Sequence, residues 1–141
     1  MLGKKLSQNL FGNSIKRFIS KDVACWGQYV VLKDSGKSAE LYKHHHQNVP
    51  AEVLTMLKKV GIYDMKIFRI GTRMFMYMET KPDFVPSVDF PKYITPRVQE
   101  WEDLMGTICD PPAEAGPDER WVLMEEVFDL KDQHDKWVGP N

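Results

Sequence analysis

The sequence predicts an α+β domain in which an antiparallel sheet carries its helices on one face and the elements follow the order β, α, β, β, α, β. Two observations support this prediction. Apolar residues alternate with a period of two in several short segments, which is typical of half-buried strands, and recur at helical spacing in the segments between them. The 141 residues, 43% hydrophobic and 28% charged, are enough for one domain and leave little room for a second core.

The first strand is expected over residues 24–32. Its two sides are distinct, with one face made of Trp26, Gln28, Val30 and Leu32 and the other of Cys25, Tyr29 and Val31. A polar turn follows, and Ser38 is placed to cap a helix that runs through Tyr42 and His46. Pro50 lacks an N–H and so best begins a second helical segment, which Gly61 ends. The expected buried stripe of that segment is Val53, Leu54, Leu57 and Val60.

A hairpin comes next, with strands over 65–70 and 74–79 around the turn Gly71-Thr72-Arg73. Prolines then mark a loop of about fifteen residues, a length that is often functional. A helix over 97–108 presents Val98, Trp101, Leu104 and Met105. After a loop over 110–119, a last strand is expected over 121–130, followed by a polar tail. The order matches the ferredoxin-like split βαβ arrangement.

The sheet of such a domain has one uncovered face. Trp26, Phe75 or Met76, and Phe128 lie on strands that could present apolar groups there. Two of these sheets packed face to face would form a dimeric α/β barrel, so the sequence predicts a homodimer.

Residues 1–21 differ in composition from the rest of the chain. They hold five basic residues and no acidic one, with apolar residues at roughly helical spacing. This segment is either a mitochondrial presequence or a disordered basic tail, and we expect the folded domain over 22–131 with a polar tail over 132–141. The remaining residues carry a net charge of −6, which argues against nucleic acid as a partner.

Two further features bear on location. No apolar run reaches the length of a membrane span, so no membrane association is expected. Cys25 and Cys109 form no metal-binding pattern, and no secretory signal precedes them, so they are expected to be reduced thiols. The protein is therefore expected to be intracellular, in the cytoplasm or, if residues 1–21 act as a presequence, in mitochondria.

Tyr42 and His46 are the candidate reactive residues. Their spacing of four places both side chains on one face of a helix, where a phenol and an imidazole can handle protons together. The alternative is two structural residues on a half-exposed helix. The run His44-His45-His46 does not predict a metal site, because consecutive helical side chains point about 100° apart. Trp101 is expected either in the core or against the C–H face of a sugar.

Several segments together resemble the L-rhamnose mutarotase family. The segment Glu40–His46, followed by Pro50-Ala51-Glu52-Val53, Leu57 and Gly61, resembles its signature helix. The segments 66–68 and 75–79 are similar to its central hairpin, Trp101 with Met105 to its second helix, and Glu125-Glu126-Val127-Phe128 to its closing strand. The match covers roughly residues 24–130 in the same order.

The resemblance implies a dimeric ferredoxin-like barrel that interconverts the α and β anomers of L-rhamnose by acid–base ring opening, without a cofactor. His46 matches the family's proton donor, Tyr42 its substrate-binding tyrosine, and Trp101 the first of two adjacent pocket tryptophans. The second of those is Glu102 here, and a pocket tyrosine is Met65. These changes affect the substrate-binding wall, so the resemblance implies L-rhamnose first, then L-fucose, another deoxysugar or another aldose.

Two other functions fit the same scaffold. One is a different enzyme of the dimeric α/β-barrel type, such as a small monooxygenase or a lactone isomerase, which the spacing of Tyr42 and His46 disfavours. The other is a sugar-binding or interaction module without catalysis. Faster anomer exchange would indicate a mutarotase, whereas sugar binding without faster exchange would indicate the non-catalytic module.

Overall fold

The computed structural model describes residues 22–136. The two hypotheses for residues 1–21 therefore fall outside the described residues. Three long segments form the sheet, β1 (Ala24–Leu32), β2 (Ile62–Ile70) and β3 (Arg73–Thr80). Two short strands, β4 (Cys109–Asp110) and β5 (Val122–Leu123), both pair with β1. The antiparallel order β2-β3-β1-β4 confirms the α+β prediction and the ferredoxin-like arrangement.

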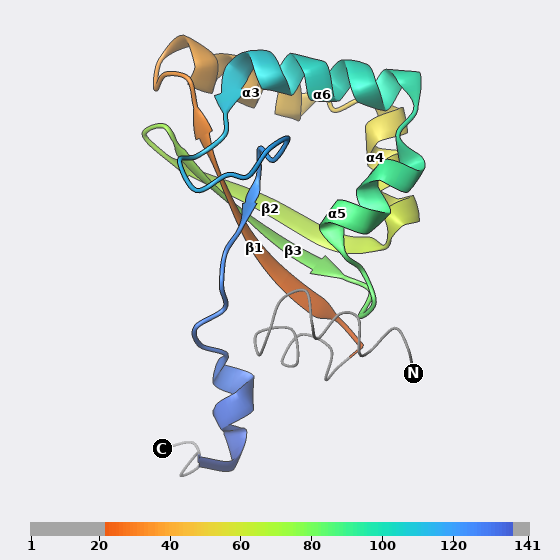
Figure 1. The fold of residues 1–141 in the computed structure, drawn as a ribbon, viewed down its shortest axis with the longest axis vertical. Helices are drawn as coiled ribbons and strands as arrows, with labels where there is room; N and C mark the ends of the chain where they lie inside the picture. Colours follow the sequence, from red (N-terminus) through yellow and green to blue (C-terminus); the bar gives the residue numbers. More distant parts are fainter. Residues whose placement is uncertain (1–21, 137–141) are drawn as a thin grey trace.

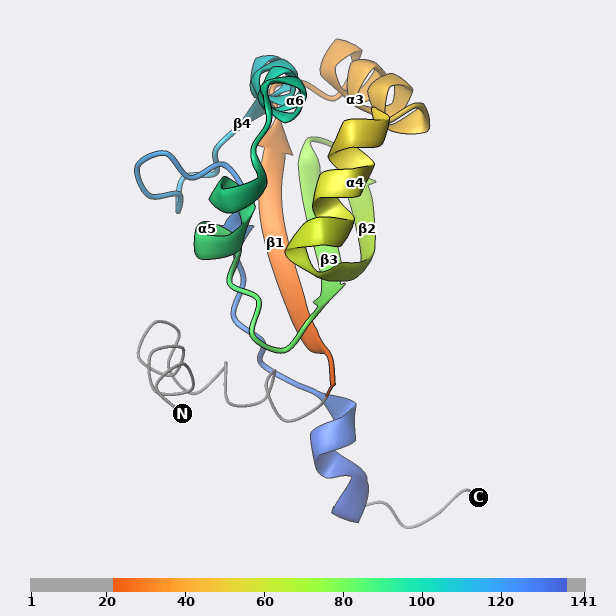
Figure 2. The ribbon, with the colours of Figure 1, turned by 90° about the vertical axis from the view of Figure 1, so that its right-hand side faces the viewer.

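The helices lie on one side of the sheet (Figures 1 and 2). They are α3 (Lys37–Gln47), α4 (Ala51–Val60), α5 (Pro86–Asp89) and α6 (Pro96–Ile108), with a 3₁₀ turn η1 (Phe90–Tyr93) between the last two. The proline-rich loop thus contains two short helical turns of its own. Within residues 22–136 no helix has both the length and the apolar character needed to cross a membrane.

The strands alternate between a buried and an outward face, as the period of two predicts. On β1, one side is buried under the helices and the other is half-exposed. Trp26 and Met76 both belong to the buried face, so the expectation that either covers the open face is wrong. Phe75 does lie on the outward face, where one edge of its ring approaches the open side of Gly27.

The start of α3 differs from the prediction. Ser38 lies inside the helix and is not its N-cap, which is Gly36. Asp34 supplies the cap instead, because its carboxylate accepts bonds from the backbone N–H of Gly36 at 2.9 Å and of Ser38 at 3.1 Å, and from the Ser38 hydroxyl at 2.7 Å. These bonds to the charged form lower the pKa of Asp34.

Helix α4 turns a slightly different face to the core. Val53, Met56 and Val60 are buried, whereas Leu54, predicted to be buried, is 48% exposed. Val53, Leu57 and Val60 of the predicted stripe do face the core, with Leu57 half-buried against it, so only Leu54 was predicted wrongly, and Met56 is the buried residue that was missed. Gly61 ends the helix with a left-handed backbone, φ 100°, as predicted, and its N–H donates to the carbonyls of Leu57 and Lys58.

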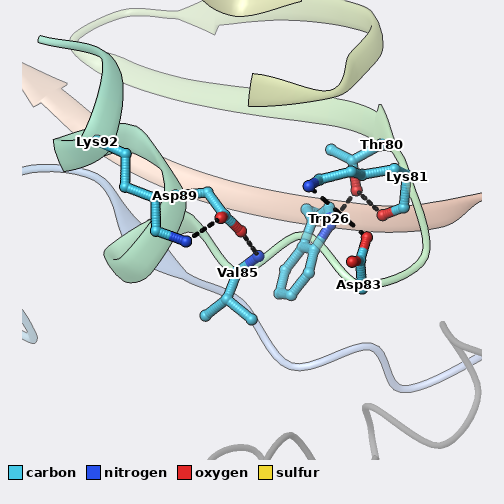
Figure 3. Close-up of polar contacts among 7 residues, drawn as sticks. All are labelled: Trp26, Thr80, Lys81, Asp83, Val85, Asp89 and Lys92. Carbon is cyan, nitrogen blue, oxygen red and sulfur yellow. Dashed lines mark hydrogen bonds and ion pairs between the residues drawn. The ribbon is translucent and has the colours of Figure 1, made fainter. Parts of the chain in front are cut away.

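Two separate groups of polar contacts lie along the segment between β3 and α6 (Figure 3). The indole N–H of Trp26 donates to the Thr80 hydroxyl at 2.9 Å, and that hydroxyl donates to the Lys81 carbonyl at 3.0 Å. Nearby, the buried Asp89 accepts from the Val85 backbone N–H at 2.7 Å and from Lys92 at 3.0 Å. Each group holds one part of the chain between the sheet and α6.

The last predicted strand is mostly absent. Of the expected range 121–130, Val122 and Leu123 pair with β1, and the Met124 N–H donates to the Gly27 carbonyl at 2.8 Å. The chain then leads away from the domain to a 3₁₀ helix, η2 (Leu130–Lys136), as both ribbon views show. Val127 and Phe128, which lie on this segment, are 82% and 62% exposed. Apolar residues continue beyond Leu123, but within residues 22–136 no strand pairs with them.

Candidate active site

Helix α3 brings Tyr42 and His46 into direct contact, as their spacing of four predicts. The two rings are stacked, with centroids 4.0 Å apart and planes 19° apart. Tyr42 is buried, whereas His46 is half-buried at the edge of the helix layer. A phenol and an imidazole therefore share one face of α3, in contact and partly shielded from water.

His46 also has a defined hydrogen bond. Its Nδ1 lies 2.9 Å from the backbone carbonyl oxygen of Tyr42, which can only accept, so Nδ1 carries a proton and donates it. In the neutral ring, Nε2 then has the free lone pair. Burial lowers the pKa of His46 below its usual value, and the nearby charge of His45 adds to this, while the hydrogen bond to Tyr42 opposes it. At neutral pH the ring is a base.

The Tyr42 hydroxyl is kept protonated by its surroundings. Burial is the largest cause of its raised pKa, with smaller contributions from Cys109 and Glu102, while Arg120 lowers it. Burial likewise raises the pKa of Cys109 to about 11. At neutral pH Tyr42 thus carries a hydroxyl that can donate a hydrogen bond, next to a basic imidazole.

Trp101 completes the group from α6. Its indole meets His46 edge to face, with ring centroids 5.1 Å apart and planes 64° apart. The indole is buried, so it packs in the core and touches the candidate base at the same time. Helices α3 and α6 therefore hold the His46 ring between Tyr42 and Trp101.

A cavity of about 320 Å³ opens beside this group. It is lined by Tyr42, Lys43, His46, Gln47, Ile67, Arg69 and Met74. Its walls are α3 and the inner side of the hairpin formed by β2 and β3. The volume lies near the lower end of the range for small-molecule sites, a size suited to one small ring.

The remaining predicted site residues lie at different places. Met65 is half-buried against the core on β2, but it is not part of the cavity wall. Glu102 lies on α6 and forms an ion pair with Arg120, whose guanidinium also donates to the Glu102 carbonyl at 3.0 Å. Glu102 and Arg120 both act on the pKa of Tyr42, so they border the same group.

Two basic residues of the site were not predicted. Arg69 is two residues beyond Ile67 and four beyond Met65, so the period of two of a strand could have placed it on the same face of the sheet as these residues. Arg120 comes from the long loop between β4 and β5, and nothing in its sequence neighbourhood points to the site. His44 and His45 contact each other edge to face with centroids 5.5 Å apart, whereas His46 faces Tyr42 and Trp101.

Comparisons with known proteins decide the family. The model of the L-rhamnose mutarotase family matches residues 26–130. The chain belongs to this family. As a member, it is a sugar mutarotase, an isomerase that acts on carbohydrates, and the predicted resemblance is confirmed.

Relatives of this mutarotase include a UPF0734 protein of Dictyostelium discoideum, 41% identical over 79% of this chain and 93% of that protein. An L-fucose mutarotase of Xanthomonas campestris is 31% identical over 63% of this chain and 72% of that protein. The crystal structure of an L-rhamnose mutarotase from Formosa agariphila superposes with a TM-score of 0.56, covering 74% of this chain and 96% of the other at 20% identity, which shows the shared fold.

Proposed function

We propose that this mutarotase uses His46 and Tyr42 to interconvert the α and β anomers of L-rhamnose or a related deoxysugar or aldose. One observation carries the proposal. The His46 ring, with Nδ1 engaged by a backbone carbonyl, is held between Tyr42 and Trp101 at the wall of the cavity. The relative named L-fucose mutarotase makes L-fucose the second sugar to test.

The proton steps follow from the states of the two groups. Nε2 of neutral His46 takes the proton of the anomeric hydroxyl as the bond between the anomeric carbon and the ring oxygen breaks, and the Tyr42 hydroxyl gives its proton to that oxygen. The free aldehyde rotates and the ring closes on its other face. Closure reverses both transfers, so His46 is then the proton donor. His46 is therefore the base during ring opening and the proton donor during ring closure, and the family resemblance names only the second of these roles.

Anomer exchange measured by magnetisation-transfer NMR tests the proposal. The full chain is expected to speed exchange between the anomeric protons of equilibrated L-rhamnose or L-fucose. His46→Ala is expected to lower this rate by about 10²- to 10⁴-fold, the usual contribution of a general base. His44→Ala, on the exposed side of the same helix, is the matched control and is expected to keep the rate. Binding without faster exchange would identify a sugar-binding module, and a fully active His46→Ala would contradict the assignment.

We further propose that the protein is a homodimer joined through the open face of the sheet. This face exposes Phe68 by 56%, Ile70 by 79% and Phe75 by 39%, an apolar surface unusual on a monomer. The extended segment after β5 adds exposed Val127 and Phe128. Sedimentation at micromolar concentration is expected to show twice the mass of 16.4 kDa, and Phe75→Asp is expected to reduce it to one chain. A single-chain mass for the unchanged protein would rule the dimer out.

For location, we propose the cytoplasm or, if residues 1–21 act as a presequence, mitochondria. Cys25 and Cys109 form no disulfide, which suits a reducing compartment. Fusing residues 1–25 to a fluorescent protein separates the two. Import into mitochondria would support the presequence. Fluorescence in the cytosol alone would rule the presequence out, so the cytoplasm would be the remaining location.

A further inference from the structure

Arg69 lines the same cavity as His46. We propose that Arg69 binds an anionic group of the sugar, so that the preferred substrate among the aldoses is an acidic one, carrying a carboxylate or a phosphate. The inference rests on the proposed function and narrows its substrate class. It does not follow from the family resemblance, which implies neutral deoxysugars.

The position of Arg69 on the edge strand makes the guanidinium available. In the register of the hairpin Arg69 pairs with Met74, so both face the helix side of the sheet, where Met74 also lines the cavity. One N–H of Arg69 donates to the Gly71 carbonyl at 2.8 Å, which anchors the side chain along the strand. A guanidinium has five N–H donors, so four remain. Within residues 22–136, Arg69 forms no ion pair.

The charge of the cavity wall also favours an anion. Of its seven residues, Lys43 and Arg69 are basic and none is acidic. Lys43 lies 3.3 Å from Glu40, but both side chains are more than half exposed, and such pairs contribute little. His46 is neutral at pH 7 and adds no charge of its own. The wall thus carries two positive charges that the lining itself does not neutralise.

A neutral deoxysugar would leave this charge unused. A carboxylate or phosphate can accept two parallel N–H bonds from a guanidinium, which are stronger than bonds between neutral groups. Because His46 lies on α3 and Arg69 on β2, a ring with its anomeric carbon at His46 can direct an exocyclic substituent to Arg69. The exocyclic C6 takes no part in the bond that breaks between C1 and the ring oxygen, so the anionic group is expected there.

Anomer exchange with matched sugar pairs tests this inference. We would compare D-galacturonate with D-galactose, D-glucuronate with D-glucose, and D-glucose 6-phosphate with D-glucose, using L-rhamnose as a reference. At least one acidic sugar is expected to exchange with a kcat/KM about 10- to 100-fold above its neutral partner, with a KM that rises with salt. Faster exchange of a uronate would identify a carboxylate as the preferred anionic group, and faster exchange of the sugar phosphate would identify a phosphate.

Arg69→Met is expected to remove this preference by slowing exchange of the acidic sugar far more than exchange of its neutral partner, while Arg69→Lys keeps part of it. Arg73→Met is the matched control, because Arg73 pairs with Ile70 and lies on the opposite face of the same hairpin. A folded Arg69→Met that lowers acidic and neutral sugars equally, or no acidic sugar faster than its partner, would overturn the inference. Exchange of neutral sugars alone would leave the proposed function standing, whereas exchange of no sugar would defeat both.

Discussion

The Nδ1 of His46 donates to the backbone carbonyl of Tyr42 across 2.9 Å, while the two rings stack with centroids 4.0 Å apart. One residue thus orients the other in two ways. The carbonyl selects the tautomer, and the phenol and the Trp101 indole fix the plane of the imidazole. A base whose tautomer and direction are set before the sugar arrives needs no reorganisation during proton transfer.

The pH dependence of exchange follows from the state of His46. Its pKa is lowered, chiefly by burial, and the neutral form is the active one, so activity is lost as pH falls through the lowered pKa. We expect kcat/KM, corrected for uncatalysed exchange, to stay level from pH 8 to below 6.5 and to decline only at lower pH. His45→Ala is expected to move this decline to higher pH, since the charge of His45 lowers the pKa of His46, whereas His44→Ala leaves it in place. A decline centred above pH 6.5 would contradict the assignment.

The Tyr42 hydroxyl can be removed without disturbing the ring stack. Tyr42→Phe keeps an aromatic ring on His46 but cannot give a proton to the ring oxygen of the sugar. We expect exchange to fall by about 10²-fold, with the fold and sugar binding retained. Tyr93→Phe, which removes an exposed hydroxyl, serves as the control. Unchanged exchange in Tyr42→Phe would show that another group or water serves the ring oxygen.

Local patterns predicted most of the fold and the contact of Tyr42 with His46, because a spacing of four on a helix determines which side chains meet. What they missed depends on contacts between distant segments. Asp34 caps α3 in place of Ser38 because of where the turn folds back. Arg120 reaches Glu102 from eighteen residues away through a loop without periodicity. The residues after Leu123 were predicted to continue the last strand, but a strand also needs a neighbouring strand to pair with, which local sequence does not determine.

By the family resemblance, Glu102 stands where a second pocket tryptophan is expected, although Glu102 does not line the cavity itself. Glu102 forms an ion pair with Arg120, and both residues lie near Tyr42 and influence its pKa. We expect Glu102→Trp to change the ratio of kcat/KM between L-rhamnose and L-fucose by about tenfold or more while exchange persists, since shape and polar contacts of a wall set specificity. Asp103→Trp, on the exposed side of α6, tests for a general effect of an added indole. An unchanged ratio in Glu102→Trp would place the sugar away from Glu102.

The stability of the domain depends on the backbone at Gly61. Its φ of 100° is strained for any residue with a Cβ, and a Cβ there would come within 2.6 Å of the Lys81 side chain, where β3 leads into the loop. We expect Gly61→Ala to lower the free energy of unfolding by about 1–3 kcal/mol, measured by urea denaturation. Gly116→Ala, in an exposed loop with only Glu119 at 3.4 Å, is expected to stay within about 0.5 kcal/mol of the unchanged protein. Since Gly61 lies outside the cavity wall, exchange per folded molecule should be preserved in Gly61→Ala. Equal stability of the two variants would mean that α4 can end without a left-handed residue.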